Sequence, residues 1–171
     1  MIKIILLALV TVCPCRGSIV TNDLNGLWQA NTCIGSGLAE VWYFSPDGTF
    51  LFRASSMDGA ARLREFCGTW VVLDDTLRLT VTAEIIEEGG HLEPGDGTTS
   101  IGSDSILVDS EEVERTLDPP EIRNLIIESL GLDTMESNPE LPADLMRMDL
   151  DGTTYWRFTS DPESAMELLG I

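Results

Sequence analysis

Positive charge is scarce in this sequence. Lys and Arg number 10 against 29 Asp and Glu, which gives a formal net charge of −19. Nucleic-acid binding relies on basic side chains that neutralise phosphates, so we expect this chain to bind neither DNA nor RNA. The same charge argues against docking on anionic lipid. It indicates either a highly soluble surface or attraction of cationic partners.

Residues typical of metal and catalytic sites are also scarce. His91 is the single histidine, whereas a zinc site needs several His or Cys ligands. A Ser-His-Asp triad would depend on His91 alone, and the sequence has no Gly-x-Ser-x-Gly motif. Residues 149–152 resemble the start of a calcium loop, but no twelve-residue loop ending in Glu follows, and a hairpin turn accounts for them better. We therefore expect no metal, no cofactor and no enzymatic activity.

Long apolar runs are lacking outside the N-terminus. Lys3 precedes a short apolar run at residues 4–12, and small residues follow. This pattern predicts a signal peptide over residues 1–17, with the mature domain at 18–171. A bilayer span takes about 20 apolar residues, so no integral membrane span is expected in the mature form. We expect a periplasmic or secreted protein.

Cysteines number only 4. Cys13 and Cys15 fall within the expected signal peptide, and a lipid anchor on one of them is the less favoured alternative. Cys33 and Cys67 remain after cleavage and predict a disulfide, since the protein is expected in an oxidising compartment. On the chain-entropy account such a bond would contribute roughly 3–4 kcal/mol. The alternative is a pair of buried free thiols.

Three segments predict β-hairpins, because turn residues and apolar faces agree in each. They run over residues 41–53, 66–81 and 145–158, and they turn at 46–48, 74–75 and 150–152 respectively. The predicted cross-strand pairs are Phe44 with Phe50, Trp42 with Phe52, Trp70 with Leu79, Val72 with Leu77, Met148 with Thr154, and Met146 with Trp156.

Two further strands are expected, at residues 27–33 and 105–109, which makes about eight strands. Hairpin neighbours are antiparallel, so the fold class predicted is all-β, an antiparallel up-and-down β-barrel. A short C-terminal helix is expected from Asp161-Pro162-Glu163 to Leu169.

The stretch over residues 84–142 is expected to be an acidic, flexible insertion, with residues 84–104 its most mobile part. It is rich in Gly, Ser and Pro. One inserted helix is predicted from Pro119 to Leu130, because Asp118 and Glu121 form a capping box and apolar residues recur at helical spacing. This helix would lie across a barrel mouth or pack on the outside.

The predicted registers place aromatic and sulfur-containing side chains on one face. Small barrels either fill such an interior or hold one small apolar ligand in it, and both alternatives stay open here. If the interior is a cavity, the ligand-binding residues are Trp42, Phe44, Phe50, Phe52, Trp70, Met146, Met148 and Trp156.

Gly26-Leu27-Trp28, the aromatic hairpin after it and Gly68-Thr69-Trp70 resemble the bacterial lipocalin-like domains of the calycin superfamily. The resemblance implies an up-and-down barrel, export and binding of a small hydrophobic molecule. It also implies structural roles for Gly26 and Trp28, with Trp28 closing the barrel base. Arg157 in the last strand would stack over that indole.

The expected function is therefore that of an exported lipocalin-like protein that binds a small hydrophobic ligand in its barrel. The alternative is a protein-binding barrel, such as a secreted enzyme inhibitor or an envelope assembly factor. A roomy interior favours the first function. A packed interior with an exposed apolar patch favours the second.

Overall fold

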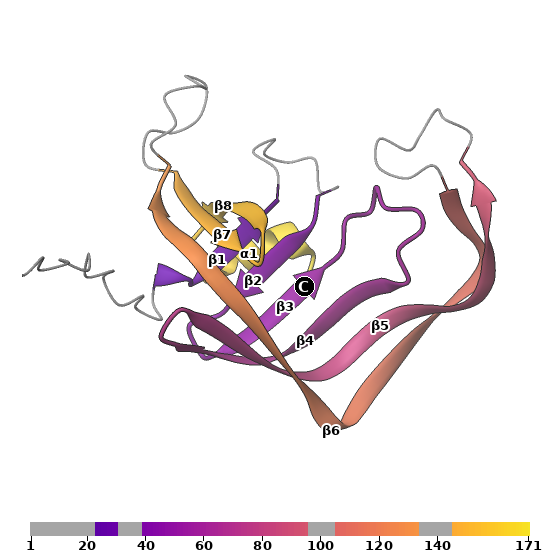
Figure 1. Ribbon diagram of the computed structural model, residues 1–171, viewed down its shortest axis with the longest axis horizontal. Helices are drawn as coiled ribbons and strands as arrows, with labels where there is room; N and C mark the ends of the chain where they lie inside the picture. The colour runs from indigo at the N-terminus through magenta and orange to yellow at the C-terminus, as the bar shows by residue number, and fades with distance from the viewer. Residues whose placement is uncertain (1–22, 31–38, 96–104, 134–144) are drawn as a thin grey trace, which may run out of the picture.

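Eight antiparallel strands and one short helix make up the part of the chain that the computed structural model describes, residues 23–30, 39–95, 105–133 and 145–171. The strands form one sheet that closes into a barrel in the order β1 to β8, so each strand lies beside its neighbours in the sequence (Figure 1). The elements are β1 (Gly26–Gln29), β2 (Val41–Phe44), β3 (Thr49–Arg53), β4 (Leu63–Leu73), β5 (Thr76–Pro94), β6 (Ser105–Leu132), β7 (Met146–Leu150), β8 (Thr153–Thr159) and α1 (Pro162–Leu169).

The predicted all-β up-and-down barrel and the C-terminal helix are confirmed. The expected signal peptide lies outside the described residues. None of the helices within those residues is long and apolar enough to cross a bilayer.

The first two hairpins have the predicted registers. In the β2–β3 hairpin Phe44 lies opposite Phe50 and Trp42 opposite Phe52. The Asp47 carboxylate accepts a hydrogen bond of 2.9 Å from the backbone N–H of Thr49, which closes the loop. In the β4–β5 hairpin Trp70 lies opposite Leu79 and Val72 opposite Leu77. Turn chemistry and alternation were sufficient to predict these four pairs.

The predicted register of the third hairpin is wrong by one residue. Met148 lies opposite Tyr155 and not Thr154, because the β7–β8 turn has two central residues and not three. Asp151 (φ 50°) and Gly152 (φ 82°) both have positive φ, as a type I′ turn requires. A one-residue slip exchanges the faces of a strand. Trp156 therefore leaves the inner face, and Tyr155 and Arg157 join it.

The predicted helix from Pro119 to Leu130 is also wrong, because these residues belong to strand β6. β6 pairs with β5 from Ile126 opposite Thr76 to Glu121 opposite Val81. In this register the apolar residues alternate, with Leu125 turned toward the core and Ile122 and Ile126 on the outer face. A long neighbouring strand offers more hydrogen bonds and burial than the local capping signal, so tertiary pairing overrides helix propensity.

The expected irregular insertion is largely a two-stranded ribbon that extends β5 and β6 beyond the barrel (Figure 1). Residues 84–94 pair with residues 105–115, whereas residues 96–104 lie outside the described part. At the register shift between Val81 and Ala83, residues 117–120 of β6 lie opposite a single residue of β5. Strand β6 bends sharply along its length (Figure 1). The β3–β4 connection holds the ribbon, since Leu107 donates a backbone hydrogen bond of 2.8 Å to Gly59.

Mobility of this ribbon stays a prediction. Among the described residues, its strands have no third neighbour along most of their length, and many of its residues are exposed, as at 89–93 and 111–112. Isolated two-stranded ribbons are marginally stable in water. We expect amide hydrogens of residues 88–93 to exchange faster than those of residues 77–81, as measured by hydrogen-deuterium exchange and mass spectrometry. Equal protection in the two segments would contradict this expectation.

Apolar side chains gather on both faces of the sheet. The larger cluster fills the barrel and includes Trp28, Phe44 and Met148, none of which is exposed to solvent. The smaller cluster lies outside, where Ala165 and Leu169 of α1 pack against Leu27 and Tyr43. α1 thus covers the outer face of β1 and β2, and it leaves the outer face of β4, β5 and β6 uncovered among the described residues.

Candidate functional site

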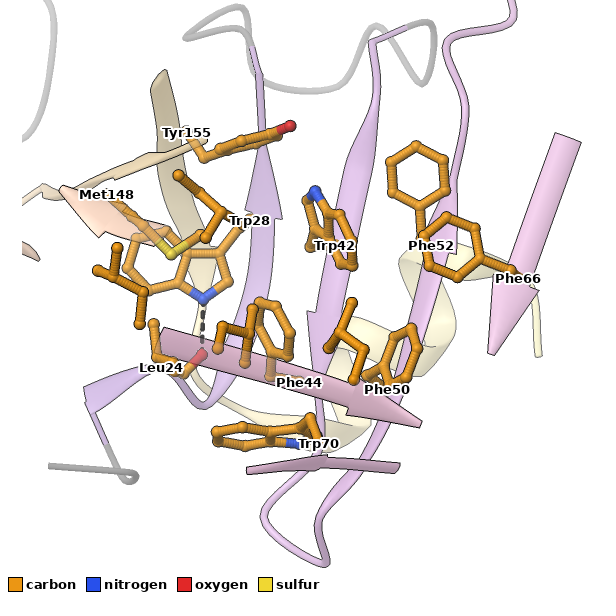
Figure 2. Close-up of a cluster of buried hydrophobic side chains, with 14 of the residues drawn as sticks. Leu24, Trp28, Trp42, Phe44, Phe50, Phe52, Phe66, Trp70, Met148 and Tyr155 are labelled. Atoms are coloured by element: carbon orange, nitrogen blue, oxygen red, sulfur yellow. Dashed lines mark hydrogen bonds between the residues drawn. The ribbon is translucent and has the colours of Figure 1, made fainter. Parts of the chain in front are cut away.

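The barrel interior is built around aromatic rings that contact one another (Figure 2). The centroid of Trp42 lies 5.7 Å from that of Phe44 and 4.7 Å from that of Phe52. Phe44 in turn lies 5.2 Å from Trp70, and Phe50 lies 5.8 Å from Phe66. Each of these rings is at most 8% exposed. Stacked, tilted and edge-to-face contacts at these distances are those of a packed aromatic core.

The structure brings together most of the residues predicted to line a ligand site. Trp42, Phe44, Phe50, Phe52, Trp70 and Met148 belong to one buried cluster, and Met146 packs against it. Trp156 does not join them, because the corrected register turns it outward. Its indole nitrogen donates a hydrogen bond of 2.9 Å to Asp133 Oδ2.

Two aromatic residues of the interior were missed by the sequence reasoning. Phe66 is 4% exposed and Tyr155 is 3% exposed, and both belong to the inner cluster. Counting back by twos from Trp70 reaches Phe66, so the alternation already contained that signal. Tyr155 would have followed from the two-residue Asp151-Gly152 turn.

A polar group lies at one end of this apolar interior. The Tyr155 hydroxyl donates a hydrogen bond to the Glu40 carboxylate. Burial raises the pKa of Tyr155, and the hydrogen bond to Glu40 raises it further. The indole nitrogen of Trp42 is buried and makes no hydrogen bond of good geometry, and Figure 2 shows it pointing toward the same end as the Tyr155 hydroxyl. Its interaction with that hydroxyl lowers the pKa of Tyr155, but by less than burial raises it.

The raised pKa of Tyr155 predicts alkaline sensitivity. An unfolded tyrosine has an ordinary pKa of 10.0. A group whose pKa is higher in the folded state contributes stability below its unfolded pKa and loses it as the pH rises toward the folded value. We expect the free energy of unfolding to fall above pH 10, and to fall less in Tyr155→Phe. Denaturant titrations at a series of pH values measure both slopes. Identical slopes would show that Tyr155 does not carry the effect.

The base of the barrel has the expected contact between Trp28 and Arg157. Trp28 is fully buried, and its indole nitrogen donates a hydrogen bond of 2.7 Å to the backbone oxygen of Leu24. The guanidinium carbon of Arg157 lies 5.7 Å from the centroid of the Trp28 ring, within cation–π range. Gly26 has φ of 125°, and a β-carbon there would overlap the carbonyl oxygen of Thr159. These residues join the first strand to the last.

The expected disulfide between Cys33 and Cys67 stays a prediction, because Cys33 lies outside the described residues. Cys67 is partly buried on β4. Burial raises the pKa of its thiol, and the nearby Glu65 and Glu114 carboxylates raise it further. As a thiol, Cys67 would therefore be a poor nucleophile.

The outer face of β4, β5 and β6 carries exposed apolar side chains. Their exposed fractions are 42% for Val71, 48% for Leu73, 49% for Ile122 and 47% for Ile126. The registers place Leu73 opposite Thr76, and Thr76 opposite Ile126. The four apolar side chains therefore lie on both sides of the outward-facing side chains of β5. We call Val71, Leu73, Ile122 and Ile126 the outer patch. Exposed apolar groups gathered on one face are typical of interaction surfaces.

Comparison with known proteins found no matching family model, no matching curated protein and no matching solved structure. The resemblance to lipocalin-like domains therefore stays a prediction. Over the part of the chain that the structure describes, no group of three or more His, Cys, Asp or Glu side chains is arranged to hold a metal ion.

Proposed function

We propose that this barrel is an exported protein-binding module that recognises its partner through the outer face of β4, β5 and β6. The observation that carries the proposal is the outer patch, four apolar side chains between 42% and 49% exposed on three neighbouring strands. The packed aromatic interior supports the same function. Because aromatic side chains fill the interior, the outer patch is an apolar surface that remains exposed to a partner. An enzyme inhibitor and an envelope assembly factor both belong to this class.

Site-specific photocrosslinking tests this function. A photoreactive amino acid at Thr80, between the strands that carry the outer patch, should form one reproducible adduct with a single protein in cells that export the chain. The matched control position is Glu163 in the first turn of α1. The expected result is an adduct from Thr80 that Ile122→Ser weakens, and none from Glu163. Adducts from both positions in equal yield, or from neither, would contradict the proposal.

Binding of a small apolar ligand is the second candidate function. The observation that favours it is the indole N–H of Trp42, which is buried at the polar end of the interior and makes no hydrogen bond of good geometry there. A ligand with an acceptor atom there would receive that hydrogen bond, provided that the aromatic rings separate to admit it. Intrinsic tryptophan fluorescence titrated with fatty acids, retinoids and quinones tests this function. Trp42→Phe should abolish any response, and a lack of response in the unaltered protein excludes this candidate for those ligand classes.

A further inference from the structure

Part of strand β6 has no neighbour on one side in the described part of the barrel wall. Residues 121–126 pair with β5, and the pairing of β6 with β7 begins only at Ile127. Within the described residues, 121–125 therefore have a ladder partner on one side only. An unpaired edge presents backbone donors and acceptors that are available to another chain.

The alternation of an antiparallel ladder identifies the available backbone groups. The N–H of Ile127 donates a hydrogen bond of 2.8 Å to the carbonyl of Asp75, which precedes β5, so this residue faces β5. Alternate residues face opposite sides, so Leu125 and Arg123 also face β5. The N–H and C=O groups of Ile122 and Asn124 then point to the free edge. The carbonyl of Ile126 agrees with this alternation, because it accepts a hydrogen bond of 2.9 Å from Asp151, on the side away from β5.

Apolar side chains stand directly beside this edge. Ile122 and Ile126 belong to the outer patch and flank Asn124 on the outer face. A strand added at the edge would place alternate side chains next to these two isoleucines. Backbone pairing and apolar contact would therefore act together, as in β-strand addition generally.

Charge indicates the kind of strand that fits. The whole chain carries −19, so a second copy at this edge would be repelled. Two arginines lie near the edge. Arg123 already pairs with Glu121 at 2.9 Å and lies 4.3 Å from the centroid of Phe66, and Arg78 of β5, opposite Asn124, is exposed on the outer face. The exposed carboxylates of Asp118 and Glu128 lie on either side of the segment. The carboxylates of Asp118, Glu121 and Glu128 outnumber the two arginines around the segment, so a cationic strand would be attracted more than an acidic one.

We propose that an extended segment of a partner protein, bearing Arg or Lys at alternate positions, adds to β6 as an edge strand along residues 121–125. This inference rests on the proposed protein-binding function and assigns it a partner chemistry. The cationic side chains lie near the carboxylates of β6, and the apolar ones cover Ile122 and Ile126.

Asn124→Pro is the decisive variant. Proline removes the outward N–H of residue 124 but no hydrogen bond to β5, and an edge strand tolerates it when that N–H faces solvent. Asn124→Ala is the matched control, since it keeps the N–H and removes only the side chain. The probe is a fluorescein-labelled ten-residue peptide of alternating Arg and Val, measured by fluorescence polarisation against the full mature protein. A peptide of alternating Arg and Gly has the same charge and a low strand propensity.

For Asn124→Pro, the expected Kd of the Arg-Val peptide is at least tenfold higher than for the unaltered protein. For Asn124→Ala, the Kd should stay within twofold of that of the unaltered protein. The Arg-Gly peptide should bind at least tenfold more weakly. If Asn124→Pro fails to fold, Ile122→Arg serves instead, because this exposed substitution sets a like charge beside the docking strand. It should weaken the Arg-Val peptide by a similar factor.

Two outcomes would overturn the edge-strand inference. One is equal binding by Asn124→Pro and Asn124→Ala, and the other is equal affinity for the Arg-Val and Arg-Gly peptides, which would indicate charge attraction alone. Neither outcome affects a Thr80 adduct in the crosslinking experiment. The proposed protein-binding function would then stand, but without strand addition at β6. Absence of both the adduct and peptide binding would remove the function and the inference together.

Discussion

Replacing Phe50 by alanine is expected to lower the free energy of unfolding by about 3–5 kcal/mol. Phe50 is 3% exposed, and its ring lies 6.1 Å from Trp42 and 5.8 Å from Phe66, centroid to centroid. Truncation removes these contacts and leaves a void that the neighbouring strands cannot fill by collapse. Chemical denaturation followed by tryptophan fluorescence measures the loss.

Leu132→Ala is the matched control for Phe50→Ala. Leu132 is 59% exposed on β6, so its truncation should change the free energy of unfolding by no more than about 0.5 kcal/mol. A cost for Phe50→Ala that is close to the control value would mean that Phe50 borders empty space. The small-ligand function would then become the better account of the interior.

Gly26→Ala is expected to lower the free energy of unfolding by about 2–4 kcal/mol. The φ of 125° at Gly26 lies in a region that residues with a β-carbon rarely adopt, and the added carbon would overlap the Thr159 carbonyl oxygen. To relieve the overlap, β1 would have to move away from β8. The free energy of unfolding from denaturant titration gives the magnitude.

Gly131→Ala provides the comparison for Gly26→Ala. Gly131 lies on β6 with nothing within 4 Å of an added β-carbon. Its substitution should be neutral or stabilising by up to about 1 kcal/mol, because alanine restricts the unfolded chain. If the two variants were equally stable, the close approach of β1 to β8 would not be a constraint on the fold.

Local patterns were sufficient to predict the barrel, because hairpin turns and period-two alternation act over a few residues. Phe44 and Trp70 were placed correctly by turn chemistry alone. The β7–β8 register failed because Leu150 was counted as part of the turn, although Asp151-Gly152 completes a type I′ turn without it. One residue of turn length decided whether Trp156 or Tyr155 faced inward.

The predicted Pro119–Leu130 helix failed for a different reason. Its capping box and apolar spacing are genuine local signals, but the conformation of residues 121–126 depends on β5, whose pairing residues lie forty to fifty positions earlier in the sequence. Period-3.6 and period-two patterns overlap when apolar residues are dense, as at Leu125, Ile126 and Ile127. The free edge of β6 could not be predicted for the same reason, because it is defined by which strands do not pair with it.

Pairing of β1 with β8 has a consequence for the order of folding. Leu27 lies opposite Thr159, so the seam of the barrel joins segments from the two ends of the domain. Contacts of such large sequence separation form slowly, because a long loop must close before they can be made. During folding β1 therefore keeps one edge unpaired until β8 has formed beside it. We expect Trp28, which is buried at this seam beside Arg157, to reach its native fluorescence in the slowest refolding phase. Native Trp28 emission before that phase would show that the seam closes early.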